Sequence, residues 1–223
     1  MKSNTARRLR KHAVLLLCTA MAACAEEPPP VLAHYPAPSA PRPLAKPVER
    51  RQAPAARVMA PIGPGGPSGP LVAARVGSYM DALESDLRRH VHGKGITVVR
   101  IGDDIAVVVR NDRLFGPSGA LGGDDVLEPL GAILDGYVHT VVWVNGFTDT
   151  AGSPDTNLAV SQKRARTIAD ALMHEGVAAQ RITAQGFGEA HLRIATGDGK
   201  KEPRNRRIEI VLKASPERTT ATR

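Results

Sequence analysis

The sequence NGFTDTAG at residues 145–152 follows the most strand-like run of the chain, His139 to Asn145, and precedes a helical pattern. Asp149 stands at the start of the intervening loop, where functional side chains commonly sit on a rigid scaffold. Arg164 follows about two turns into the helix. The two elements therefore offer a carboxylate and a guanidinium, which together can hold the ammonium and the carboxylate of a small zwitterion.

We predict that the helix spans residues 157–175, with Asn157 as its N-cap. Seven residues make nearly two helical turns, so Asn157, Ser161 and Arg164 share one face, which can face the loop carrying Asp149. Spacing alone leaves an alternative, an exposed Asp149–Arg164 salt bridge that contributes about 0–1 kcal/mol. The apolar side of this helix is predicted to carry Leu158, Ala165, Ile168, Ala169, Leu172 and Met173.

Helices and strands alternate along the rest of the folded region. Apolar periodicity predicts a helix over residues 72–90 and a second helix that Asp124 or Asp125 caps. A turn-rich stretch, residues 111–123, precedes that second helix. The predicted strands are residues 96–101, 105–110, 139–145, 181–185 and 206–212. This order indicates a sheet with helices packed on it.

Two arginines begin the last predicted strand. Side chains alternate along a strand, so Arg206 falls in the apolar row of Ile208, whereas Arg207 falls in the row of Glu209. A charge in an apolar row must reach a partner or a pocket at the end of the strand, which makes Arg206 a candidate site residue. The alternative is that both arginines are solvated.

The N-terminus is typical of an exported lipoprotein. Residues 1–23 form a predicted signal peptide with a basic start and an apolar run that is too short to span a bilayer. Small residues before Cys24 resemble a bacterial lipobox, which implies that Cys24 is acylated and attaches the chain to the lipid bilayer. Ala25 in place of Asp resembles lipoproteins that are sorted to the outer membrane and face the periplasm.

Residues 24–71 are predicted to be the acylated cysteine and a disordered tether. Thirteen of the 18 prolines fall between Pro28 and Pro70, and proline removes backbone donors and favours extended conformers. We place the folded domain at residues 72–213 and a flexible tail at residues 214–223.

The charge distribution argues against a nucleic-acid partner. The formal charge is +8, but five basic residues lie in the first eleven, and the remainder holds 25 basic and 22 acidic residues. Seven aromatic residues (three Phe, three Tyr and one Trp) supply few platforms for stacking bases. His90 and His92 form the single close histidine pair of the sequence and lack further ligands, so we expect no metal and no cofactor.

Several blocks of the chain, in order, closely resemble the OmpA-like C-terminal domain over about residues 105–213. The matching blocks are Gly146–Asp149, Gly152, Asn157, Ser161, Arg164–Ala165, Gly176–Val177, Arg181–Ile182, Gln185–Glu189 and Asn205–Ile210. The resemblance implies an α+β fold, a two-layer sandwich in which helices pack on a mixed β-sheet with a βαβαβ-β core.

The same resemblance implies that the domain binds peptidoglycan non-covalently and recognises diaminopimelate in the stem peptide. Asp149 matches the position that holds the ammonium, and Arg164 matches the position that holds the carboxylate. Asn157, Arg206 and Thr148 complete the implied peptidoglycan-binding set. The resemblance implies no catalytic residues, so we expect a protein that is not an enzyme.

Three positions depart from the family pattern and leave the exact stem-peptide chemistry open. Phe147 replaces a histidine, Gly116 replaces an acidic residue after Leu114-Phe115, and Ala151 replaces a hydroxyl. Two alternative functions also remain, a component of a motility or secretion machine anchored to the wall, and an enzyme acting on peptidoglycan. The short apolar N-terminal run disfavours the first, since such machine components usually have a transmembrane helix.

Overall fold

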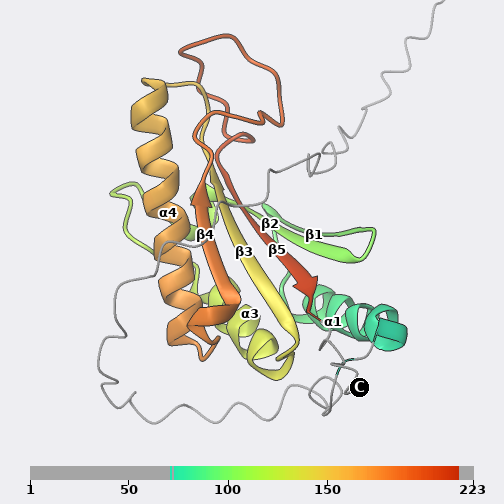
Figure 1. The fold of residues 1–223 in the computed structure, drawn as a ribbon. Coiled ribbons are helices and arrows are strands. Elements are labelled where there is room, and N and C mark those ends of the chain that lie inside the picture. Colours follow the sequence, from blue (N-terminus) through green and yellow to red (C-terminus); the bar gives the residue numbers. More distant parts are fainter. Residues whose placement is uncertain (1–70, 72, 216–223) are drawn as a thin grey trace, which may run out of the picture.

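The computed structural model describes residue 71 and residues 73–215 (Figure 1). The predicted signal peptide, Cys24, the tether up to residue 70, and residues 216–223 lie outside the described residues. Within the described part, no helix combines the length and the apolar character needed to cross a membrane.

The elements follow the predicted alternation of helices and strands. In chain order they are η1 (Ala73–Arg75), α1 (Val76–His90), β1 (Ile96–Ile101), β2 (Asp104–Arg110), α2 (Asn111–Leu114), α3 (Asp124–Gly136), β3 (Thr140–Phe147), α4 (Pro154–His174), η2 (Ala179–Arg181), β4 (Ile182–Gly186) and β5 (Arg207–Ala214).

The five strands form one mixed sheet in the order β1-β2-β5-β3-β4. β3 and β4 are parallel and connected through α4, whereas every other neighbouring pair is antiparallel. The last strand therefore lies at the centre of the sheet, between β2 and β3 (Figure 1). This arrangement confirms the predicted α+β fold, a mixed sheet with helices packed on it.

Helices α1, α3 and α4 cover the core face of the sheet. Alternate strand residues, such as Val107, Val144 and Ile210, are fully buried and pack with the apolar sides of these helices. Burial of this apolar surface supplies the main favourable term for folding the domain. Leu158, predicted on the apolar side of α4, is instead 50% exposed near the start of the helix.

Two glycines let α4 approach the sheet unusually closely. A Cβ atom built at Gly146 of β3 would lie 2.4 Å from the carbonyl oxygen of Ser161. One built at Gly186 of β4 would lie 2.3 Å from the backbone nitrogen of Gln162. Since any side chain would collide with helix backbone, these glycines fix where the middle of α4, and therefore Arg164, lies relative to β3.

The start of α4 corrects one prediction. Ser153, not Asn157, is the N-cap: its Oγ accepts a hydrogen bond from the backbone N–H of Thr156 at 3.2 Å. Pro154 occupies the first turn, where its fixed φ and missing N–H are favourable. Asn157 lies one turn inside the helix and is buried.

The stretch before α3 corrects two more predictions. Gly123, with φ of 78°, precedes the helix, and no side chain caps it. Asp124 and Asp125 lie in the first turn, where negative charge complements the helix dipole. The stretch predicted as turns also contains the short helix α2, which the sequence patterns did not predict.

The last strand starts slightly later than predicted, because β5 begins at Arg207 and not at Arg206.

We expect Gly146→Ala to lower the free energy of unfolding by about 1–3 kcal/mol, because the added methyl group overpacks against the backbone of α4. Gly77→Ala is the matched control, since a Cβ there meets nothing within 4 Å and alanine favours a helix. Urea unfolding followed by circular dichroism measures both. Equal stability of the two variants would contradict the close approach.

Candidate ligand-binding site

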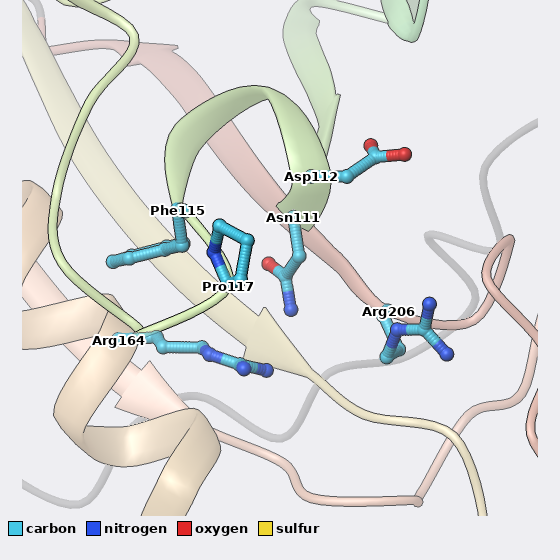
Figure 2. A pocket seen from close by; sticks show the side chains of 7 residues that line it. Asn111, Asp112, Phe115, Pro117, Arg164 and Arg206 are labelled. Atoms are coloured by element: carbon cyan, nitrogen blue, oxygen red, sulfur yellow. The ribbon is translucent and has the colours of Figure 1, made fainter.

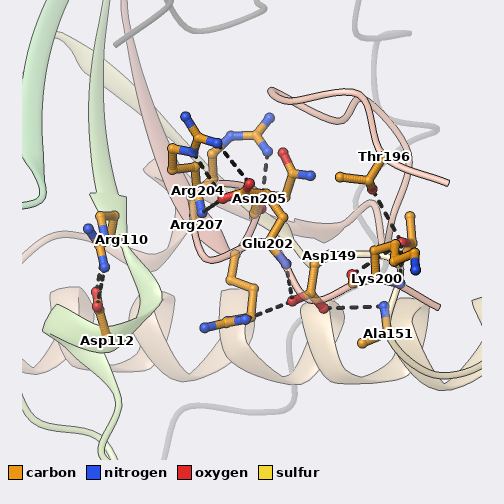
Figure 3. Close-up of polar contacts among 12 residues, drawn as sticks. Arg110, Asp112, Asp149, Ala151, Thr196, Lys200, Glu202, Arg204, Asn205 and Arg207 are labelled. Carbon is orange, nitrogen blue, oxygen red and sulfur yellow. Dashed lines mark hydrogen bonds and ion pairs between the residues drawn. The ribbon is translucent and has the colours of Figure 1, made fainter. Parts of the chain in front are cut away.

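Asp149 is a buried carboxylate directly after β3, and it is 5% exposed. Its Oδ2 accepts a hydrogen bond from Nη1 of Arg206 at 2.7 Å. The same oxygen accepts one from the backbone N–H of Glu202 at 3.1 Å (Figure 3). Its Oδ1 accepts one longer bond, 3.4 Å, from the N–H of Ala151. Among the described residues, Asp149 therefore forms its ion pair with Arg206. It forms none with Arg164, so the alternative of a surface Asp149–Arg164 salt bridge is wrong.

Thr150 fastens the loop that leads to Arg206. Its Oγ1 donates to the carbonyl oxygen of Gly197 at 2.7 Å and accepts from the N–H of Lys200 at 3.1 Å. Asn205 closes the same loop through two bonds of 2.8 Å with the backbone of Ile194. These contacts hold residues 187–206 beside the loop of Asp149, so that Arg206 is fixed directly before the start of β5.

Arg164 projects from α4 as a half-buried cation. Its guanidinium carbon lies 5.6 Å from the centre of the Phe115 ring, which gives a cation–π contact. Burial, and then the nearby charge of Arg206, lowers the pKa of Arg164, while Asp149 raises it. Within the described residues Arg164 makes no salt bridge with a carboxylate. A half-buried guanidinium group without a carboxylate partner can be stabilised by charge-assisted hydrogen bonds to an anionic ligand.

A cavity of about 440 Å³ lies between α2, α4 and the start of β5 (Figure 2). Its lining residues are Asn111, Asp112, Phe115, Gly116, Pro117, Arg164 and Arg206. The side chain of Arg164 extends from α4 toward Arg206, which lies on the opposite side of the cavity with its guanidinium group turned away from Arg164 (Figure 2). Asp149 is not part of the lining and contacts the cavity through Arg206. The cavity thus offers the guanidinium group of Arg164 to an anion. Arg206 adds positive charge on its far side, and the exposed carboxylate of Asp112 lies at its edge.

The remaining predicted site residues lie outside the cavity lining. Asn157 is 5% exposed, and its Nδ2 donates to Oε2 of Glu189 at 2.7 Å. Thr148 is 3% exposed, its backbone N–H donates to the carbonyl oxygen of Gly188 at 2.8 Å, and its hydroxyl has no hydrogen-bond partner in the described part of the chain. The structure therefore brings Arg164 and Arg206 together at the cavity, while Asp149 lies outside the lining and is paired with Arg206.

Sequence reasoning missed the contribution of α2 and the loop that follows it. Asn111, Asp112 and Pro117 line the cavity, yet they belong to a stretch with no helical or strand periodicity. The apolar pair Leu114-Phe115 was the available signal, since both residues are buried although they lie among turn residues. No group of three His, Cys, Asp or Glu within residues 71 and 73–215 could hold a metal ion.

Arg207 forms a separate, buried ion pair. It is 1% exposed, and its Nε donates to Oε1 of Glu209 at 2.6 Å. Its guanidinium carbon lies 3.9 Å from the centre of the Phe147 ring, which stacks on Phe187 at 5.3 Å. The alternative of two solvated arginines is therefore wrong for Arg207. Phe147, which stands where the family pattern has a histidine, packs against the Arg207 side of this ion pair.

We expect Arg207→Ala to lower the free energy of unfolding by about 3–5 kcal/mol, because it leaves Glu209 as a buried charge without this partner. Arg206→Ala should cost clearly less, since the Arg206 side chain is 34% exposed and Asp149 keeps two backbone donors. Thermal and urea unfolding of both variants test this contrast. A larger loss for Arg206→Ala would contradict the assigned roles.

Residues 123–206 match the model of the OmpA family. The chain is 39% identical over 140 residues to a protein of Escherichia coli K12 named "Probable lipoprotein YiaD", which covers 61% of this chain and 64% of that relative. It is 37% identical over 71 residues to the peptidoglycan-binding protein ArfA of Mycobacterium tuberculosis, covering 32% of this chain and 22% of ArfA. The chain thus spans less than two thirds of the length of these curated relatives.

Among solved structures, a MotB-like protein from Desulfovibrio vulgaris is similar, with a TM-score of 0.54 and 23% identity. The match covers 66% of this chain and 95% of that one. At this identity the likeness shows a shared fold and nothing further.

Proposed function

We propose that this chain, in which residues 123–206 form an OmpA-family domain, binds peptidoglycan non-covalently through the diaminopimelate of the stem peptide. The single observation that carries the proposal concerns Arg164. Its half-buried guanidinium group lines the cavity and forms no ion pair with a carboxylate among the described residues. The printed name of the relative ArfA, a peptidoglycan-binding protein, supports the same ligand class.

In this proposal Arg164 holds the ligand carboxylate through charge-assisted hydrogen bonds. Arg206 lies across the cavity and strengthens the attraction, because its charge is only partly offset by Asp149. The Oδ1 atom of Asp149 makes a single long hydrogen bond, so it keeps lone pairs for the ligand ammonium. Thr148 and Asn157 support the loop and the helix that carry these groups.

We further propose that binding occurs without catalysis. The cavity-lining side chains offer ionic contacts, amide hydrogen bonds and an apolar ring, which are means of recognition. Release of soluble muropeptides from sacculi incubated with the chain would contradict this part of the proposal and favour an enzyme.

The proposed location is the periplasmic face of the outer membrane, where acylated Cys24 anchors the chain. The lipobox-like sequence before Cys24 and the printed name of the Escherichia coli relative support this location. Each buried methylene of a lipid chain contributes about 0.8 kcal/mol, so two or more acyl chains hold one end of the protein firmly. The proline-rich tether would then set the effective concentration of the domain at the wall.

We expect Arg164→Ala to weaken co-sedimentation of the full-length chain with purified sacculi by about tenfold or more, since a hydrogen-bonded charge contributes about 1.5–3 kcal/mol. Arg166→Ala is the matched control, because Arg166 is an exposed arginine on the same helix. Circular dichroism should be unchanged in both variants. Equal binding by the two would remove Arg164 from the site.

We expect Cys24→Ser to abolish lipid attachment while leaving sacculus binding by the purified chain intact. Mass spectrometry of the native N-terminus, together with palmitate labelling, measures cleavage before Cys24 and acylation. An unmodified wild-type N-terminus that still begins at Met1 would contradict the anchor without touching the binding site.

A further inference from the structure

Asn111 carries a buried amide that the fold itself does not use. The residue is 5% exposed, and neither Oδ1 nor Nδ2 has a hydrogen-bond partner in the described part of the chain. Buried amides are normally paired, because an unpaired one loses its hydration without compensation. The side chain lines the cavity and extends into it between Arg164 and Arg206 (Figure 2).

The backbone around Asn111 is fixed, so the amide has a defined place. Its N–H donates to the carbonyl oxygen of Arg206 at 3.0 Å, and its carbonyl oxygen accepts from the N–H of Phe115 at 2.8 Å. Asn111 is thus attached to the same strand end that carries one of the cavity arginines. A side chain held in this way is preorganised for a ligand that reaches the cavity.

The chemistry of the amide selects the kind of ligand group. An asparagine side chain presents an acceptor and two donors next to each other, which match the N–H and the C=O of a peptide backbone. A carboxylate alone would satisfy the Nδ2 donors and leave Oδ1 unpaired. The neighbouring guanidinium groups already serve the carboxylate, and they cannot accept a hydrogen bond from a peptide N–H.

We propose that Asn111 is a specificity-determining residue that reads the peptide backbone next to the amino acid whose carboxylate Arg164 holds. The inference rests on the proposed function and deepens it. The cavity recognises a peptide-linked diamino acid in preference to the free amino acid, because only the peptide satisfies both polar ends of the Asn111 amide.

This role separates binding from stability in a testable way. A residue retained for packing or local hydrogen bonding loses stability when it is replaced. Replacing an unpaired buried amide by leucine, which has a similar shape, removes a desolvation penalty and should hold or raise the melting temperature. A gain in stability coupled to a loss of ligand discrimination marks a functional residue.

Isothermal titration calorimetry on the full-length chain compares two probes, free meso-diaminopimelate and the tripeptide L-Ala-γ-D-Glu-meso-diaminopimelate. We expect the wild type to bind the tripeptide about tenfold more tightly, the amount expected from one or two added hydrogen bonds. Asn111→Leu should reduce this ratio to near one. Asn111→Asp, which is nearly isosteric, should weaken tripeptide binding further, because a carboxylate cannot donate to the peptide C=O and repels the ligand carboxylate.

The outcomes distinguish the two levels of the proposal. If the wild type binds neither probe and does not bind sacculi, the proposed function fails. If the wild type binds both probes but Asn111→Leu and Asn111→Asp keep the wild-type ratio, only the role of Asn111 is overturned. A lower melting temperature of Asn111→Leu with an unchanged ratio would identify Asn111 as a structural residue and also overturn the inference.

Discussion

The 2.7 Å ion pair between Asp149 and Arg206 joins two segments that lie far apart in the sequence. Asp149 follows β3 and Arg206 precedes β5, and these strands are neighbours in the sheet. The buried carboxylate also accepts the N–H of Glu202, so it fixes the end of the long 187–206 loop. Without this contact, Arg206 would be a mobile surface cation, and one wall of the cavity would lose its defined position.

The other wall depends on the distance between α4 and the sheet. Glycines at matched positions of β3 and β4, paired in register as Gly146 and Gly186, allow the backbone of Ser161 and Gln162 to touch the strands. Arg164 follows one turn later and therefore lies near Arg206, and this proximity contributes to lowering its pKa. Two cations brought together by the fold store an electrostatic cost that an anionic ligand can relieve. The site is thus a consequence of helix placement as much as of residue type.

The sequence allowed the fold to be predicted because its signals are local. Apolar periodicity located α1, α3, α4 and the strands, and the order of the motif blocks indicated the family. Arg164 and Arg206 were predicted as site residues, and both lie at the cavity, although their role in binding remains a prediction. Asn111 could not be found in this way, because its burial depends on a one-turn helix packed against distant residues. The cap of α4 was misplaced because Asn157 and Ser153 are both good caps, and Pro154 decides between them.

Arg206 and Arg207 illustrate how strand geometry separates a site from a scaffold. Adjacent residues point to opposite sides, so one side chain reaches the cavity while the next is enclosed with Glu209 and Phe147. The alternation rule correctly separated the two rows, but it left open whether the arginines are solvated. In this fold β5 is a central strand whose second face is also buried at Arg207 and Glu209, so polarity there signals an internal ion pair. The position of a strand within the sheet, which no local pattern contains, therefore decides whether a charged residue on it supports the fold or meets a ligand.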